Sequence, residues 1–342
     1  MSERVKSAEA LAPVQMQVGC TLGIVVIGRN EGERLQTCFL SVAEVGRCVV
    51  FVDSGSTVDS LAVAAAMGIE CVALDLHTPF TAARARNAGF DRLSMLCPDL
   101  RYVQFIDGDC EIAPHWLTEA VKFLDSHAQV AVVCGRRKER FPDRSVYNRL
   151  CDIEWNIPVG QIRACGGDAL MRAEVIEAIG GYNPALIAGE EPELCVRLRQ
   201  AGWKIWCIDQ PMTMHDAAML RFGQWWKRSK RSGHAFAEGA ALHGTPPERH
   251  WVRESRSAVF WGLCIPMLVI LGSALIGPMG FILLFVYPLQ VARIGLRGQR
   301  GLRDVWPRAF YLILGKFPEM IGVLTYLWHR WTHKQAILIE YK

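Results

Sequence analysis

The sequence lacks the cysteine spacings of a zinc site and of a disulfide framework. Its twelve cysteines are scattered singly along 342 residues, with no CxxC pair and no Cys/His spacing suited to zinc. Several lie within or next to strand-like apolar runs, namely Cys48, Cys71, Cys110 and Cys207. This distribution predicts reduced thiols in a cytosolic domain.

The first residues also lack the apolar core of a signal peptide, and the chain as a whole has little excess charge. We expect residues 1–19, beginning MSERVKSAEALAPVQMQ, to be a short disordered lead. The net charge of +4 does not indicate a nucleic-acid partner. Hydrophobic residues are abundant: they make up 51% of the sequence, which is high for a soluble enzyme and indicates a membrane.

Apolar, β-rich runs alternate with helical patterns through the first 135 residues. Strands are predicted at 20–28, 48–53, 70–74, 102–107 and 129–134, and helices over 81–96 and 114–126. Such alternation predicts an α/β fold with a largely parallel sheet and right-handed crossovers.

The stretch YVQFIDGDCE places two carboxylates, Asp107 and Asp109, at the carboxyl end of a buried strand. Open α/β sheets bind ligands at that edge. Two carboxylates there can hold Mg²⁺ or Mn²⁺ and leave positions open for a diphosphate. The alternative interpretation is a simple turn, because Asp and Gly favour turns for backbone reasons.

Two further segments suggest ligand contacts. Asp53 ends the second strand before the small residues of SGSTVDS, where backbone N–H groups can approach a nucleotide, although an ordinary helix cap has the same composition. Arg84 and Arg86 begin a helix, where cations oppose the helix dipole. A phosphate or base contact explains that placement, and so does a solvated helix face.

The second half of the domain adds glycines and acids. Gly166 and Gly167 suggest either a close backbone approach to a ligand or a tight turn. Glu190 and Glu191 begin a helix, where acids are favoured, but one aimed into a cleft can serve as a general base. His215 is either structural or a ligand for Mn²⁺.

The ordered set IGRNEG, VDSGSTVD, ARARNAG, IDGDCE, CGGDALM and GEEPEL resembles a family 2 glycosyltransferase with the GT-A fold over roughly residues 20–235. The resemblance implies a Rossmann-like, mostly parallel sheet with flanking helices. It places Asp53 and Arg86 near the nucleotide base, with Glu31 and Asp107 among the donor-binding residues.

The same resemblance makes Asp107 and Asp109 the DxD pair, with Asp109 the direct ligand of Mg²⁺ or Mn²⁺ and His215 a further metal or diphosphate contact. It implies an acceptor-side loop, Gly166-Gly167-Asp168. Glu191 stands where the family has its catalytic Asp, with Glu190 before it. Glu in place of Asp is a departure from the family pattern. A second departure is that Gln224-Trp225-Trp226-Lys227-Arg228 does not reproduce the family's Gln-x-x-Arg-Trp motif, and this argues against a processive synthase.

The last third predicts a membrane attachment. Residues 222–256 are basic and rich in Trp, as expected of a helix on an anionic lipid surface, and we assign 236–256 as an interfacial linker. No charge occurs in Ser257–Ala292, and Gly277-Pro278 divides that run into a hairpin of two helices, about 257–276 and 279–292. Residues 309–331 are predicted to be an interfacial helix or a third crossing within 257–342.

Together these observations predict an inverting, metal-dependent transfer of one sugar from a nucleoside diphosphate sugar to a lipid-linked or polysaccharide acceptor. Basic residues on both sides of the hairpin place the catalytic domain, 20–235, on the cytoplasmic face of the inner membrane, in contact with membrane lipids. The alternatives are a noncatalytic membrane subunit of a polysaccharide assembly machine and a sugar nucleotidyltransferase. The retained acids disfavour the first, and the absence of a Gly- and Arg-rich triphosphate loop disfavours the second.

Overall fold

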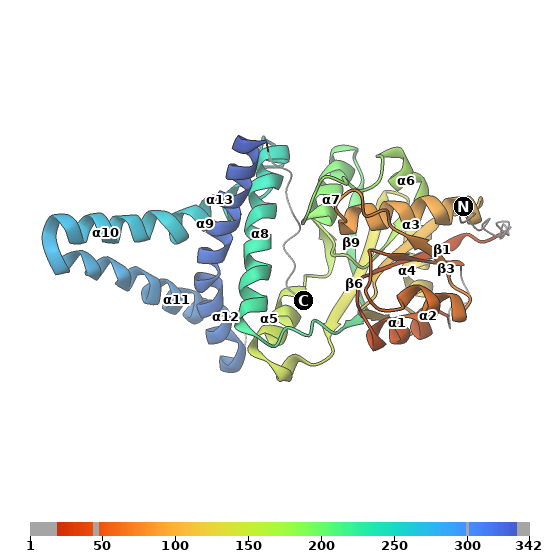
Figure 1. The fold of residues 1–342 in the computed structure, drawn as a ribbon, viewed down its shortest axis with the longest axis horizontal. Helices are drawn as coiled ribbons and strands as arrows, with labels where there is room; N and C mark the ends of the chain where they lie inside the picture. Colours follow the sequence, from red (N-terminus) through yellow and green to blue (C-terminus); the bar gives the residue numbers. More distant parts are fainter. Residues whose placement is uncertain (1–18, 44–47, 299–300, 334–342) are drawn as a thin grey trace, which may run out of the picture.

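A computed structural model describes residues 19–43, 48–298 and 301–333, so the lead predicted for 1–19 lies outside the described residues except for Gly19. An α/β domain occupies one end of the molecule, and a helical hairpin projects from the other (Figure 1). Two long helical segments, α8 and α12–α13, stand between them.

One nine-stranded sheet forms the centre of the α/β domain, in the order β3-β2-β1-β4-β8-β6-β9-β5, with β7 paired to β9. The first four strands in this order are parallel: β3 (Glu70–Ala73), β2 (Cys48–Asp53), β1 (Leu22–Gly28) and β4 (Tyr102–Asp107). The others are β8 (Ala169–Arg172), β6 (Val130–Glu139), β9 (Lys204–His215), β5 (Cys110–Ile112) and β7 (Gly160–Ile162).

The sheet is mixed rather than mostly parallel. Strand β8 is antiparallel to both β4 and β6, while β5 and β7 are antiparallel to β9. These strands have three or four residues each, which is too short for a sequence pattern to indicate whether they run parallel or antiparallel to their neighbours. The parallel half, whose strands are continuous apolar runs, follows the prediction.

Helices cover both faces of the sheet. Figure 1 shows α3, α6 and α7 on one side and α1 and α2 on the other. The helices of this domain are α1 (Glu33–Ala43), α2 (Ser60–Ala66), α3 (Ala82–Leu96), α4 (Trp116–Ser126), α5 (Val146–Trp155), α6 (Ala173–Ala178) and α7 (Glu190–Gln200). Helix α3 lies very close to β1, since a Cβ on Gly89 would stand 2.3 Å from Val25.

The C-terminal helices begin with α8 (Phe222–His243), which runs without a break across the domain boundary predicted at residue 235. The hairpin consists of α9 (Val252–Val259), a π-helical turn at Phe260–Cys264 and α10 (Ile265–Ile276). It returns through a 3₁₀ segment (Gly277–Phe285) and α11 (Val286–Arg297). The bend at Gly277-Pro278 is where the sequence predicted it.

The stretch predicted as one helix over 309–331 is two helices, α12 (Leu302–Leu314) and α13 (Lys316–Thr332), joined at Gly315. Lys316 and Glu319, which interrupt the apolar pattern, form an ion pair of 2.6 Å. Together α12 and α13 run across the base of the hairpin, between it and α8 (Figure 1).

Trp225 does not lie on a membrane surface as expected. Its ring is buried, stacks on Tyr147 of α5 and meets Tyr311 of α12 edge-on. The sequence cannot distinguish an interfacial Trp from a packed one, because both are placed on one face of an amphipathic helix. In this structure the partners of Trp225 are Tyr147 of the α/β domain and Tyr311 of α12.

Candidate active site

The carboxyl ends of β2, β1 and β4 meet at one edge of the sheet. Gly28 of β1 pairs in register with Asp53, and Ile27 pairs with Asp107. The two acids therefore end the strands on either side of β1. This is the edge at which the sequence predicted ligand binding.

Asp53 organises the loop that follows it. Its carboxylate accepts hydrogen bonds from the backbone N–H groups of Gly55 (3.0 Å) and Ser56 (2.9 Å) and from the Ser56 hydroxyl. Asn30 ties this loop to the turn after β1, because its side-chain oxygen accepts a bond from the Thr57 N–H at 2.7 Å. Hydrogen bonds thus link the loop of the IGRNEG motif to the loop of the VDSGST motif.

Arg86 is the centre of the site. It projects from the first turns of α3 toward the sheet and is almost fully buried. Its guanidinium lies 2.9 Å from Asp107, 3.1 Å from Glu190 and 2.8 Å from Glu191. One cation surrounded by three carboxylates leaves the cluster with an excess of negative charge. These partners differ from the expected position beside Asp53 and the nucleotide base.

Glu190 and Glu191 open α7 and have different environments. Glu190 is buried, whereas the side chain of Glu191 is 13% exposed and so retains access to the site. Burial, followed by the negative charge of Glu190, raises the pKa of Glu191 to about 7, although Arg86 opposes the shift. A carboxyl group with a pKa near neutrality is suited to proton transfer.

The loop predicted to face the acceptor approaches these side chains closely. A Cβ on Gly167 would lie 2.6 Å from Arg86 Nη2, 2.9 Å from Asp107 Oδ2 and 3.2 Å from Glu191 Oε1. A side chain at this position would require these three groups to move. By contrast, a Cβ on Gly166 would have ordinary contacts, the nearest being 3.9 Å from Arg137.

Asp168 has a supporting position rather than an exposed one. It is fully buried and accepts hydrogen bonds from the Asp107 N–H (3.1 Å) and the Thr213 hydroxyl (2.7 Å). It also forms an ion pair of 2.8 Å with Arg137. Because it has no exposed surface, the structure does not support its prediction as an acceptor-binding residue. It fixes the end of β4 instead.

Asp109 and His215 lie together as predicted for a metal site. The register of β5 with β9 pairs Cys110 with His215, and this brings His215 Nε2 to 3.3 Å from Asp109 Oδ1. Ligand atoms of Asp109, Cys110 and His215 all lie within 4.8 Å of one another. Carboxylate and imidazole donors fit Mn²⁺. Asp107 belongs to a second such group, with Cys110 and Asp168, and it also faces Arg86 and Arg137.

The sequence interpretation missed Arg137 and Glu139 of β6. Arg137 approaches Asp107 at 3.7 Å, and Glu139 lies 3.8 Å from His215 Nδ1, the ring nitrogen that does not face Asp109. The two residues are two positions apart on a strand, so their side chains share one face. That spacing was visible within the basic stretch GRRKER, but nothing in the sequence indicated that β6 extended so far.

Glu31 lies beside the acid pair. It forms an ion pair of 2.8 Å with Arg34, and its Cγ would be 3.4 Å from a Cβ on Gly108.

The structure gathers Arg86, Asp107, Gly167, Glu190 and Glu191 into one cluster. The neighbouring pair Asp109 and His215 adjoins it, with Asp53 two strands from Asp107.

Comparisons with known proteins agree with this architecture. Residues 23–177 match the sequence model described as Glycosyl transferase family 2. The mannosyltransferase PcManGT from Pyrobaculum calidifontis, in complex with GDP-Man and Mn²⁺, shares 17% identity with a TM-score of 0.55, covering 90% of this chain and 87% of that one. At this identity the likeness concerns the fold, and it confirms the predicted GT-A architecture.

A curated relative shares a higher sequence identity over a much shorter stretch. The succinoglycan biosynthesis protein ExoA of Rhizobium meliloti (strain 1021) is 42% identical over 52 residues. The match covers 15% of this chain and 16% of that relative, or about a sixth of its length.

Proposed function

We propose that the chain is a family 2 glycosyltransferase, whose sequence model matches residues 23–177. It transfers one sugar from a nucleoside diphosphate sugar to a lipid-linked or polysaccharide acceptor at a membrane. The observation that carries the proposal is the Arg86 cluster beside Asp109 and His215. It combines a carboxylate of raised pKa with a carboxylate–imidazole pair at the ligand-binding edge of the sheet.

The division of roles follows from these contacts. Glu191 accepts the proton of the acceptor hydroxyl, and Arg86 holds Glu191 and Asp107 in position. Asp109 and His215 hold the divalent cation, which when bound supplies positive charge that stabilises the departing diphosphate. Gly167 lets the backbone of the loop assigned to the acceptor approach Arg86, Asp107 and Glu191 closely. Asp53 and Asn30 shape the loop assigned to the nucleotide.

A single base opposite the leaving group corresponds to a direct displacement, so we propose inversion at the anomeric carbon. The product's configuration can be read by NMR of the anomeric proton. Retention of configuration would contradict the single-base scheme. The structural relative with GDP-Man and Mn²⁺ supports the donor class and the metal, while the sugar itself is left to experiment.

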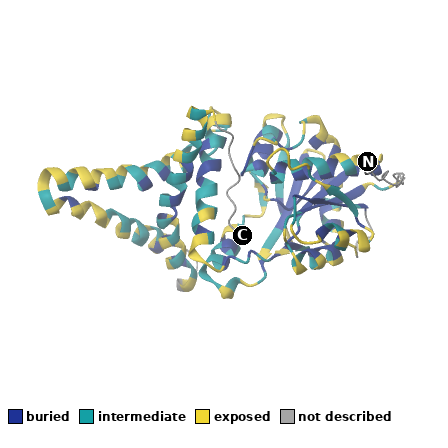
Figure 2. Cartoon of the chain, in the orientation of Figure 1, coloured by how far each residue is buried: buried dark blue, intermediate teal, exposed yellow. Residues whose placement is uncertain are grey.

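A membrane location is supported by the exposed surface of the hairpin. Two helical segments, Val252–Arg297 and Arg303–Thr332, are long and apolar enough to cross a membrane. Apolar side chains are exposed along α10 and α11 (Figure 2), with Leu275 84% exposed. Since α12–α13 run across the hairpin's base, they lie along the membrane surface if the hairpin inserts. We place the catalytic domain on the cytoplasmic side of the inner membrane.

The test is nucleotide release from UDP-, GDP- and dTDP-sugars by the detergent-purified protein, with membrane lipids as acceptor, in Mn²⁺, Mg²⁺ or EDTA. We expect release from one donor, abolished by EDTA. Asp109→Ala should reduce turnover by about 10²-fold or more, because electrostatic stabilisation of the leaving group is lost. Donor binding without turnover would direct the search to the acceptor, whereas no donor binding would contradict the proposal.

A further inference from the structure

Helix α7, which carries Glu190 and Glu191, starts from a glycine. Its N-cap is Gly189, whose backbone is left-handed with a φ of +81°. Helices are commonly held at this position by the side chain of a Ser, Thr, Asp or Asn, and glycine has none to offer. Because glycine also permits many backbone conformations, the direction in which α7 leaves Gly189 depends on what packs against it.

The residue that packs on Gly189 is Trp251, which directly precedes α9. A Cβ on Gly189 would lie 2.6 Å from Cη2 and 2.7 Å from Cζ3 of the indole, and 3.3 Å from Ala235 of α8. Cη2 and Cζ3 are outer carbons of the six-membered ring. The far end of the indole therefore covers the residue from which the two glutamates follow.

The indole is held in place by residues outside α7. The His250 ring stacks on it with the centroids 4.2 Å apart, and Phe236 of α8 meets it edge-on at 5.3 Å. Gly239 of α8 allows this packing, since a Cβ there would lie 2.6 Å from Cε3 of the indole. Trp251 itself has a φ of +53°, a conformation that a bulky residue keeps only where its surroundings impose it.

Two further contacts tie the connection between α8 and α9 to α7. His243, the last residue of α8, lies 3.0 Å from the buried carboxylate of Glu193. Glu248 forms an ion pair of 2.5 Å with Arg199, in the last turn of α7. These two contacts hold the body of the helix, whereas Trp251 acts where the helix begins.

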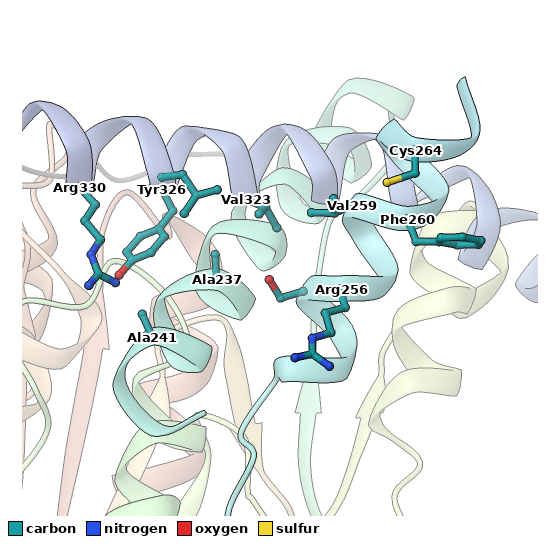
Figure 3. Close-up of a pocket in the computed structure, with 11 residues that line it drawn as sticks. Ala237, Ala241, Arg256, Val259, Phe260, Cys264, Val323, Tyr326 and Arg330 are labelled. Carbon is teal, nitrogen blue, oxygen red and sulfur yellow. The ribbon is translucent and has the colours of Figure 1, made fainter. Parts of the chain in front are cut away.

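Trp251 also stands at the start of the hairpin's first leg. Beyond it, α9 packs on α8 and α13 through three buried residues, Ala237, Ala258 and Val323. Figure 3 shows Val259 of α9 beside Val323 of α13. The indole therefore links the helices that carry the hairpin to the helix that carries the proposed base.

We propose that Trp251 is a positioning residue for Glu191. By filling the space beside Gly189, the indole sets the direction of the first turn of α7, and with it the placement of Glu191 against Arg86 and the acceptor hydroxyl. A general base must lie within hydrogen-bond distance of the proton it accepts, so a small rotation of α7 is enough to slow the reaction. The inference rests on the proposed function, in which Glu191 is the base.

Trp251→Phe separates this role from general packing, because a phenyl ring can still pack on α8 but lacks the outer carbons that lie over Gly189. The readouts on the full chain in detergent are initial rates at varied donor concentration, thermal unfolding, and hydrogen exchange of residues 189–194 by mass spectrometry. We expect kcat to fall about tenfold with KM for the donor little changed, because the base moves and the donor site does not. Exchange over 189–194 should become faster.

Trp225→Phe is the matched control. Trp225 is also a packed indole of the C-terminal helices, but it lies against Tyr147 of α5 and Tyr311 of α12. This variant should lower the unfolding temperature and leave kcat and the exchange over 189–194 as they were. An equal fall of kcat in both variants, or an unchanged kcat in Trp251→Phe, would overturn the proposal.

The exchange measurement keeps this inference apart from the proposed function. If the unaltered protein transfers no sugar from any donor, the proposed function fails, and exchange over 189–194 then decides whether Trp251 holds the start of α7. Exchange that is as slow in Trp251→Phe as in the unaltered protein would overturn the positioning role, whatever the activity.

Discussion

The chemistry of Glu191 depends on its surroundings. With its pKa raised to about 7 by burial and by Glu190, it changes charge near neutral pH. The raised pKa means that the folded state binds a proton that the unfolded state has lost above about pH 4.5. Unfolding free energy therefore falls as pH rises from about 4.5 to 7. The ionised, reactive form of Glu191 in the folded protein is gained as pH rises through about 7.

Glu191 is the proposed base of the reaction. Because only ionised Glu191 accepts a proton, kcat/KM should rise with pH and level off above about 7. Glu191→Gln should lower kcat/KM by about 10²–10⁴-fold and remove that limb of the pH profile. Donor affinity serves as the control for folding. An unchanged profile in the Gln variant would assign the titration to another group.

Gly167 provides a second test at the scale of one methyl group. Gly167→Ala places a Cβ 2.6 Å from Arg86 and 2.9 Å from Asp107, so the cluster must move and turnover should fall at least about tenfold. Gly166→Ala is the matched control, because its Cβ has only ordinary contacts. The readout is initial rate at saturating donor. Equal effects of the two substitutions would show that the close approach is unimportant.

At the scale of elements, α8 and α13 pack with their backbones almost in contact. A Cβ on Gly233 would stand 1.9 Å from the carbonyl oxygen of Glu319, and one on Gly322 would stand 2.0 Å from that of Lys230. Small residues at a helix crossing allow this approach. The close packing of α8 against α13 fixes the position of the hairpin relative to the α/β domain.

Gly233→Ala should therefore destabilise the protein. The gain in helix propensity is about 1 kcal/mol, but the clash is with backbone and cannot be relieved by a rotamer change, so a net loss of about 1–3 kcal/mol is expected. Gly223→Ala, in the same helix with open space around it, should be neutral or stabilising. Thermal unfolding in detergent measures both. A more stable Gly233→Ala protein would show that the two helices separate readily.

At the scale of the whole molecule, the hairpin and the catalytic domain lie on opposite sides of α8 and α12–α13 (Figure 1). Leu275 and Ile276, at the end of α10, are largely exposed, as are Met279 and Phe281 beyond the bend. Such a continuous apolar surface is costly in water. A bilayer is the environment that removes this cost.

Leu275→Asp should weaken vesicle association, because an acidic residue costs about 2.5–3.5 kcal/mol in a membrane core. Leu40→Asp is the matched control: Leu40 is also exposed in a helix, but it lies on α1 of the α/β domain. Flotation with liposomes is the measurement. Equal flotation of the two variants would place the hairpin outside the membrane.

Local sequence patterns were enough to predict the strands and helices of the parallel half, the sheet edge with Asp53, Asp107 and Asp109, and the hairpin with its bend at Gly277-Pro278. These follow from local periodicity and from the rule that parallel strands present their carboxyl ends at one edge. The family match and the fold comparison bear out the α/β prediction.

Which charged side chains come into contact depends on the tertiary structure. Arg86 contacts Glu190 and Glu191, which lie more than one hundred positions further along the sequence. Asp107 contacts Arg137 of β6, a strand that extends beyond its predicted end at residue 134. The β5–β9 register brings His215 to Asp109, and packing rather than lipid accounts for Trp225. Pairing register and burial are properties of contacts distant in sequence, and no local pattern encodes them.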